Sequence, residues 1–263
     1  MNKNKKGDLV SRIPAWTWTV LSLIAAVLVW SLLSKGEVTG RAFPPLLEVF
    51  GSYTKMAVAR GVFWSDILSS MISSIAGFAL GFLFGVPVAF LMAWYRPVRN
   101  IIEPWIQFIR NIPPLAYVPL VVIAVGVGRT PQIIVICIAT FLTISITVFQ
   151  GVINVDETLI KAARVLGAND RVLFAKVIFP ATTPFIITSV RLGISVALTT
   201  LIAAESTGAS AGLGMRIRAL SSTFETQPMM LYIIVVGVIG MLAEKILKFF
   251  ERRLTGWQEK REI

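Results

Sequence analysis

Long apolar stretches recur along this 263-residue chain, and they allow few folds. A helix needs about 20 mainly apolar residues to cross the hydrocarbon core of a bilayer. Inside that core each backbone N–H and C=O needs a partner within the protein, which an α-helix provides in its own segment. We therefore predict an all-α polytopic membrane protein with a single domain over residues 1–263. Its six transmembrane helices are expected at about residues 16–34, 67–95, 104–128, 132–150, 184–206 and 228–250.

The composition favours a membrane protein over a soluble domain. Hydrophobic residues make up 56% of the chain, and the mean hydropathy is +0.77. The net charge of +11 does not indicate nucleic-acid binding, because the Lys and Arg residues of a membrane protein collect on its cytoplasmic side. We expect membrane lipid around the chain and no nucleic-acid partner.

Positive charges are divided unevenly by the six predicted spans. Of the 25 Lys and Arg residues, 16 fall on the side of the two termini, seven on the other side, and two, Arg110 and Arg191, within spans. Because the excess marks the cytoplasmic side, both termini are predicted to be cytoplasmic and the 207–227 loop extracytoplasmic. The first span is predicted to be retained, because the LLSKGE sequence after it does not resemble a signal-peptide cleavage site.

Glycines repeat every four residues along the second predicted span, at Gly77, Gly81 and Gly85. This spacing places them on one face of a helix. Small residues in such a row let a second membrane helix pack closely, so the repeat predicts helix packing.

The residue types that most catalytic sites need are missing from the sequence. It has no histidine, one cysteine (Cys137) in an apolar stretch, and no nucleophile motif. The phosphate-binding pattern G-x-x-x-x-G-K-S/T is also missing, so nucleotide hydrolysis has to come from another subunit. We therefore expect that the chain is not an enzyme and binds no metal, with an intramembrane enzyme as the weak alternative.

A secondary, ion-coupled transporter is the alternative. Arg191 and Glu205 lie within the fifth predicted span, and ionisable residues in spans can carry ion coupling. Many secondary transporters are built from internal repeats, and none is found here.

Residues 154–184 form a polar, amphipathic stretch between two apolar ones, and they are the largest surface predicted to lie in water. The pattern predicts two short helices. The expected start signals are Asn154 or Asp156 for the first and Asn169 for the second, and the expected stop signals are Gly167 and Pro180.

Small residues gather on one face of the first of these helices. Ala162 and Ala163 are followed by Gly167, so another protein's groove could approach this helix closely. An amphipathic helix lying on the lipid surface explains the same pattern. The residues alone do not decide between a docking surface and a lipid-surface helix.

The same stretch resembles the EAA motif of ABC-importer permeases, the cytoplasmic loop that docks on the ATPase subunit. The alanine pair, the glycine and the Ile-Phe-Pro at 178–180 carry the resemblance. LGAND and VIFPATTPFIITSVRLGISVAL are similar to the nitrate/sulfonate/taurine branch, and the resemblance covers nearly the whole chain. Lys161 stands where the family usually has glutamate. The resemblance implies an ATPase contact made of Glu157, Lys161, Ala162, Ala163, Gly167, Ala168 and Pro180.

A second stretch, RNIPPLA at residues 110–116, is similar to the family's Arg-Pro-x-Pro-Pro-Leu-Ala element, with Asn111 where proline is usual. Two consecutive prolines remove backbone donors and kink a helix. The third span is therefore expected to be interrupted there.

The resemblance implies a type I ABC importer permease fold with a cytoplasmic coupling loop at 153–182. It implies a translocation path for a small anionic solute such as a sulfonate, taurine or nitrate. The implied partners are two ABC ATPase subunits, a second copy of this chain and an extracytoplasmic substrate-binding protein. No cofactor is expected on this chain, and ATP and Mg²⁺ would bind the ATPase. The expected location is the bacterial cytoplasmic (inner) membrane.

Four polar residues are candidates for the translocation path: Arg110, Asn111, Arg191 and Glu205. Two explanations of the arginines are open. They pair with helix-end carbonyls, with a carboxylate such as Glu103 or with lipid headgroups, or they give a cavity the positive potential that favours anions. Glu205 is expected to order the outer loop by pairing with Arg216 or Arg218.

Overall fold

The computed structural model describes residues 14–254, and within this range the chain is helical with short connections. Contacts between Cα atoms divide the chain into two units. The first comprises residues 1–61 and 220–231, and the second comprises residues 62–219 and 232–263. The single domain expected over residues 1–263 stays a prediction.

The first unit contains α1 (Ala15–Leu33), α2 (Thr39–Ala42), α3 (Leu46–Thr54) and the π-helical turn η1 (Lys55–Ala59). No residue of Trp16–Leu33 is buried, as expected for a helix that is apolar on every side and faces lipid. Near the end of α1, Trp30 contacts the segment that follows the helix. Its Nε1 donates a hydrogen bond to Pro44 O at 2.9 Å, and its ring meets Phe43 edge-on. These contacts fix the turn that follows the helix.

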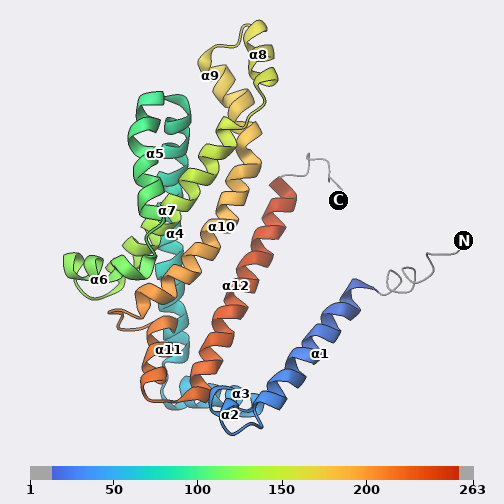
Figure 1. The fold of residues 1–263 in the computed structure, drawn as a ribbon, viewed down its shortest axis with the longest axis vertical. Helices are drawn as coiled ribbons and strands as arrows, with labels where there is room; N and C mark the ends of the chain where they lie inside the picture. Colours follow the sequence, from blue (N-terminus) through green and yellow to red (C-terminus); the bar gives the residue numbers. More distant parts are fainter. Residues whose placement is uncertain (1–13, 255–263) are drawn as a thin grey trace, which may run out of the picture. The chain divides into compact units, whose positions relative to one another are not determined.

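Three long helices form the centre of the second unit: α4 (Phe63–Trp94), α7 (Arg129–Ile153) and α10 (Phe179–Glu205) (Figure 1). The glycine row of α4 faces α7. A Cβ atom on Gly81 would lie 2.0 Å from Thr140 Oγ1, and one on Gly77 would lie 2.6 Å from Ile136 Cβ. The predicted close packing at these glycines is confirmed.

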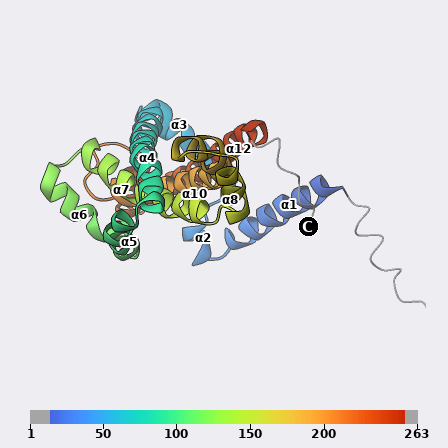
Figure 2. The ribbon, with the colours of Figure 1, turned by 90° about the horizontal axis from the view of Figure 1, so that it is seen from above.

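The third predicted span consists of two helices, α5 (Arg96–Arg110) and α6 (Pro114–Val125), bent by 103° at the break between them. The two consecutive prolines, 113 and 114, stand at this break, where the sequence predicts an interruption. Figures 1 and 2 show α6 extending outward from α4, α7 and α10.

The start of α5 differs from the predicted start of the third span. The helix begins at Arg96, and Pro104, taken as the start of the span, lies inside it. Pro97 in the first turn is compatible with a helix start, because an N–H there has no partner in the helix. The helix start is thus marked by Pro97, and the start predicted at Pro104 is wrong.

The polar stretch folds into α8 (Glu157–Val165), α9 (Asp170–Leu173) and the π-helical segment η2 (Phe174–Ile178), which runs directly into α10. Pro180 therefore does not stop the second helix, and that part of the prediction is wrong. The π-helical segment just before it changes the hydrogen-bond register. Pro180 thus takes a first-turn position of α10, where its missing N–H costs little.

Residues 207–227, predicted to be a turning loop, contain the helix α11 (Leu213–Ser222), and α12 (Thr226–Leu254) follows. The turn before α11 uses two glycines with positive φ, Gly208 at +104° and Gly212 at +139°. The glycines of this segment thus make the turn, and the residues after them form a helix where the sequence predicts a loop.

Five helices of the described residues are long and apolar enough to cross a membrane, and the bent pair α5–α6 makes up to six. The five lie at Trp16–Leu33, Phe63–Trp94, Arg129–Ile153, Asp170–Glu205 and Thr226–Phe249. The predicted all-α polytopic fold is confirmed, with the third span in two pieces.

Candidate functional site

The polar stretch is a compact helical hairpin, residues 156–173, beyond the ends of α7 and α10 (Figure 1). Asp156 is the N-cap of α8: its Oδ1 accepts a hydrogen bond from Thr158 N at 2.7 Å, and this bond lowers the pKa of Asp156. Asn169 caps α9 by accepting from Val172 N at 2.9 Å. Asn154, the alternative cap, instead donates from Nδ2 to Gln150 O at the end of α7.

Gly167 ends α8 as predicted. Its φ is +82°, and Ala168 N donates to Ala163 O at 3.0 Å in the manner of a glycine-terminated helix. A Cβ atom on Gly167 would meet nothing within 4 Å. Space around this glycine is therefore open, and the hairpin needs it for its backbone conformation.

Arg164 closes the hairpin. It forms an ion pair with Asp170, and its Nη1 donates to Ala168 O at 3.1 Å, so one side chain joins both helices. On α8, Lys161 Nζ donates to Glu157 Oε2 at 2.7 Å across one helical turn. The sequence analysis did not single out Arg164, although a basic residue beside the glycine turn could have been the signal.

Two large apolar side chains stand out from this polar hairpin. Val165 is 88% exposed and Leu166 is 87% exposed. Ala162 and Gly167 are exposed as well, while Ala163 and Ala168 are half-buried and Pro180 is exposed at the start of α10. The predicted small-residue face is therefore accessible, and two exposed apolar residues that the sequence analysis missed lie beside it.

Aromatic rings tie the base of the hairpin to the end of α4. Phe174 meets Phe90 at 5.1 Å and Trp94 at 5.9 Å between ring centroids, both edge-on. Phe179 stacks on Phe90 at 5.9 Å. A displacement of the hairpin would thus be passed to α4 and α10.

Arg191 lines a groove of about 470 Å³ between α10 and α12, and it forms an ion pair with Glu251. Glu244 lines the same groove. Arg110 and Asn111 lie elsewhere, exposed at the end of α5, where Asn111 Nδ2 donates to Gln107 O at 2.7 Å. The structure therefore does not bring the two arginines into one pocket.

Glu103 is not a partner of Arg110. It accepts a hydrogen bond from Arg99 Nε at 2.8 Å instead, one turn away on α5. The suggested pairing of Arg110 with Glu103 is thus wrong.

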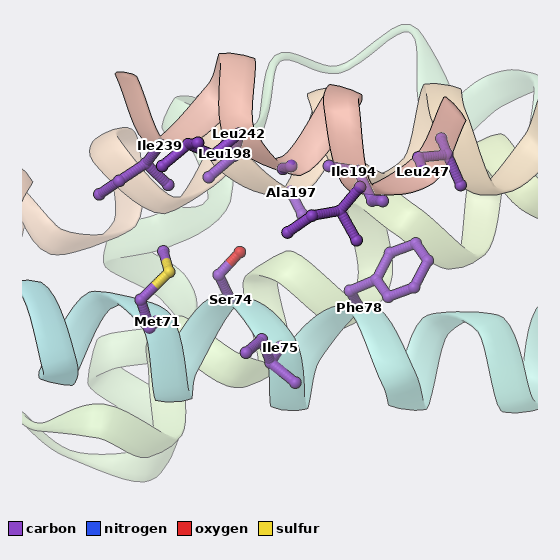
Figure 3. A pocket seen from close by; sticks show the side chains of 12 residues that line it. Met71, Ser74, Ile75, Phe78, Ile194, Ala197, Leu198, Ile239, Leu242 and Leu247 are labelled. Carbon is purple, nitrogen blue, oxygen red and sulfur yellow. The ribbon is translucent and has the colours of Figure 1, made fainter. Parts of the chain in front are cut away.

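A second groove, of about 460 Å³, lies between α4, α10 and α12 (Figure 3). Its lining is apolar apart from Ser74, with Met71, Phe78, Ile194 and Leu242 among the side chains around it. No charged residue of the described chain lines it. The two grooves share Ile194, Leu198 and Leu247, and of the two only the Arg191 groove offers charge to a polar solute.

Glu205 is fully buried and holds the first turn of α11. Its Oε2 accepts from Gly214 N at 2.7 Å, and its Oε1 accepts from Ser70 Oγ at 2.6 Å. Ser70 Oγ in turn accepts from Leu213 N at 2.8 Å, and Asp66 Oδ1 accepts from Gly212 N at 3.1 Å. Three buried side chains thus bond three successive N–H groups at a helix start, where no helical partner exists.

Arg216 pairs with Asp66 and not with Glu205, so the predicted Glu205–Arg216 pair is wrong. Arg216 Nε donates to Asp66 Oδ2 at 2.8 Å, and Tyr232 Oη donates to the same oxygen at 2.9 Å. Asp66 and Tyr232 are fully buried. The α11 cluster consists of Asp66, Ser70, Glu205, Gly212, Leu213, Gly214, Arg216 and Tyr232.

Known proteins match this chain over most of its length. A model of the family described as "Binding-protein-dependent transport system inner membrane component" matches residues 77–256. A probable ABC transporter permease protein of Brucella abortus is 44% identical over 201 residues, 76% of this chain and 80% of the relative. The taurine transport system permease protein TauC of Escherichia coli is 32% identical over 262 residues, 95% of each. The nitrate import permease protein NrtB of Leptolyngbya laminosa is 28% identical over 257 residues, 92% of this chain and 88% of the relative.

The fold matches a solved ABC importer. The MetNI methionine ABC transporter in an inward facing conformation aligns with a TM-score of 0.64 at 19% identity, over 73% of this chain and 97% of that chain. This likeness concerns the fold alone. The chain belongs to the binding-protein-dependent transport system inner membrane component family, and as a multi-pass permease of an ABC importer it is not the secondary transporter that its sequence also allowed.

Proposed function

We propose that two copies of this chain form the path of an ABC importer for a small anion, and that the hairpin, residues 156–173, is the contact with each of two ATPase subunits. A substrate-binding protein delivers the solute on the other side of the membrane. ATP and Mg²⁺ bind the ATPase subunits, and both termini lie in the cytoplasm with the hairpin.

The exposed pair Val165 and Leu166 carries this proposal. Each large apolar side chain left in water forgoes about 1.5 to 3 kcal/mol of burial free energy. The hairpin that presents the pair is held rigidly by two caps and by Arg164. A rigid, capped projection with an apolar tip favours docking into a groove of a soluble protein.

The alternative, a helix lying on lipid, draws on the same residues. Glu157, Lys161 and Arg164 share one face of α8, and Leu159 and Leu166, 53% and 87% exposed, lie on the opposite face. The two roles differ in what they predict for assembly, because only the docking role requires the hairpin for binding the ATPase.

The substrate class follows from the relatives, whose names specify taurine and nitrate, both of which carry an anionic group. Arg191 in the groove between α10 and α12 is the charge that would meet such a solute. For an anion to pass, the ion pair of Arg191 with Glu251 would have to open, or Arg191 would have to attract the anion while it stays paired. Uptake of taurine, an alkanesulfonate and nitrate into liposomes, with the cognate ATPase and binding protein, would rank the candidates.

A homodimer agrees with the apolar surface that one copy leaves uncovered. On α6, Leu120 is 67% exposed and Ile123 is 82% exposed. Two copies related by a two-fold axis would place the same surfaces against each other and enclose a path between them.

The hairpin assignment is tested by Val165→Asp and Leu166→Asp. Either charge at the tip should weaken assembly with the cognate ATPase at least about tenfold, since the lost burial exceeds about 1.4 kcal/mol. Co-purification and stimulated ATPase rate are the measurements. Val38→Asp, on an apolar residue that is 83% exposed outside the hairpin, is the matched control. Parental assembly in both hairpin variants would remove the hairpin from the ATPase contact.

A further inference from the structure

A shallow pocket lies at the base of the hairpin, between the end of α4 and the start of the α9–η2 segment. Its volume is about 630 Å³, within the range of about 300–1,000 Å³ typical of small-ligand sites. Six of its residues are apolar or aromatic, and the other two are charged: Pro87, Phe90, Leu91, Trp94, Tyr95 and Phe174, with Asp170 and Arg171.

The chemistry of the lining changes along α4. Pro87, Phe90 and Leu91 form an apolar end within the membrane span, and Trp94 and Tyr95 follow where α4 ends. Trp and Tyr are the residues enriched at the boundary between lipid and water. From Pro87 to Tyr95 is eight residues, or about 12 Å along a helix, so the pocket runs from hydrocarbon depth to headgroup depth.

The charge at the headgroup end is positive. Asp170 is engaged by Arg164 in the ion pair that closes the hairpin. Arg171 is exposed, and within residues 14–254 it forms no ion pair. The exposed Arg96 follows Tyr95 directly in the chain. The pocket thus offers a free guanidinium where a lipid phosphate would lie.

We propose that this pocket binds one anionic phospholipid, with its phosphate at Arg171 and the start of an acyl chain against Phe90 and Leu91. Along the pocket the apolar side chains come first, then Trp94 and Tyr95, and then the cation Arg171. A phospholipid presents its groups in the same order, from the acyl chain to the phosphate. Basic pockets between membrane helices on the cytoplasmic side bind anionic headgroups in this way.

The bound lipid would steady the hairpin. Arg171 lies in α9 of the hairpin and Phe174 in η2, which joins the hairpin to α10, so a lipid held by both would tie the hairpin to α4. Binding follows from the pocket alone, whereas any effect on ATPase coupling rests on the proposed function.

The test titrates lipid onto the full-length chain in detergent, without the ATPase, and counts bound lipids by native mass spectrometry. Phosphatidylglycerol should bind more tightly than phosphatidylcholine. Arg171→Gln should weaken phosphatidylglycerol binding about fivefold, the factor that corresponds to about 1 kcal/mol per basic side chain near an anionic surface. Lys176→Gln, which removes an exposed cation of η2 that does not line the pocket, is the matched control.

A second variant probes the apolar end. Leu91→Asp should weaken both lipids while Arg171 is intact, because the acyl chain loses its apolar contact. Adding excess inorganic phosphate should leave the bound phosphatidylglycerol in place, since inorganic phosphate has no acyl chain to contact the apolar end of the pocket.

Three outcomes would overturn the proposal: equal losses in Arg171→Gln and Lys176→Gln, unchanged binding in Arg171→Gln, or displacement by inorganic phosphate. The first would indicate general surface charge, and the last would indicate a site for free inorganic anions. Since no ATPase is present, these results are independent of the hairpin assignment.

Discussion

The hairpin and the α11 cluster use charged residues in opposite ways. In the hairpin, Glu157, Lys161, Arg164 and Asp170 are all exposed, and the apolar tip is exposed with them. In the α11 cluster the carboxylates of Asp66 and Glu205 are fully buried, and each accepts hydrogen bonds from backbone and side-chain donors. Under the proposed function the hairpin meets another chain, whereas the α11 cluster holds this chain together.

The difference has an energetic consequence. A buried charge that loses its partner costs several kcal/mol of stability, because water cannot solvate it. An exposed pair contributes about 0 to 1 kcal/mol, because water and salt screen it. Substitutions in the α11 cluster should therefore lower stability, and those at the apolar tip, Val165 and Leu166, should change assembly while leaving stability nearly unchanged.

Asp66→Ala should have the largest effect on stability. It leaves Arg216 without its carboxylate and removes the acceptor of Tyr232 Oη and Gly212 N. We expect a loss of about 3 kcal/mol, or a drop in the melting temperature of roughly 6–12 °C for a chain of this size. Thermal unfolding of the purified protein measures it.

Glu157→Ala in the hairpin is the control for that measurement, and it should shift the melting temperature by no more than about 2 °C. The double variant Asp66→Ala/Arg216→Ala should recover part of the loss, because it removes the unpaired cation. A double variant no more stable than Asp66→Ala would contradict the ion-pair explanation.

Two glycines with positive φ give a finer comparison of the regions. A Cβ atom on Gly212 would lie 2.4 Å from the Glu205 carboxylate, whereas one on Gly167 would meet nothing within 4 Å. Gly167→Ala should cost about 1 kcal/mol of backbone strain, and Gly212→Ala should cost about 2 kcal/mol or more, because a steric clash is added. Urea unfolding of the two variants measures both losses in the free energy of unfolding. Equal losses would show that the packing around Gly212 is looser than described.

Much of the fold could be predicted because membrane helices follow directly from apolar length. The packing of α4 on α7 could be predicted from the glycine row, and the turn between α8 and α9 could be predicted from Gly167 and Asn169. Pro180 and Pro104 misled the analysis, because a proline's effect depends on whether it falls in a first turn or after a π-helical segment. That depends on hydrogen-bond register, which a residue pattern does not reveal.

The α11 cluster could not be predicted from the sequence. Asp66 lies 150 positions from Arg216 along the chain, and a pairing over that distance leaves no periodic signal. Arg218 was an equally good candidate by spacing. The exposed tip at Val165 and Leu166 was missed for another reason: only the small residues of this helix, Ala162, Ala163 and Gly167, were considered as a docking surface.

A third set of charges, in the first unit, tests the screening argument by pH. Glu225 accepts hydrogen bonds from Lys55 Nζ at 2.6 Å and from Arg60 Nη2 at 2.9 Å, and these bonds lower its pKa from 4.5 to about 2. Because the folded-state pKa is the lower one, the pairs stabilise the fold above pH 4.5 and lose this effect as the pH falls toward 2.

The size of that effect should be about 1 kcal/mol or less, since solvent reaches both cations, whose side chains are 51% (Lys55) and 37% (Arg60) exposed. Comparing the parent with Glu225→Gln between pH 5 and about pH 3 isolates it, and added salt should shrink the difference. A salt-independent difference of several kcal/mol would mean that these charges behave like the buried ones of the α11 cluster.

The smallest effect is expected at Lys161, where the family usually has glutamate. Lys161→Glu would replace the ion pair with Glu157 by two like charges one turn apart, and both side chains are at least 75% exposed. Such a change costs about 0.2 to 0.5 kcal/mol for the lost pair and a similar amount for the repulsion. The melting temperature should fall by no more than roughly 2–4 °C. Assembly with the ATPase and stimulated ATPase activity should stay parental, because the proposed contact rests on the apolar tip and on the small residues beside it. Loss of assembly with unchanged stability would instead show that the ATPase recognises the charge at 161, and Lys161→Gln would separate the loss of the lysine from the gain of a negative charge.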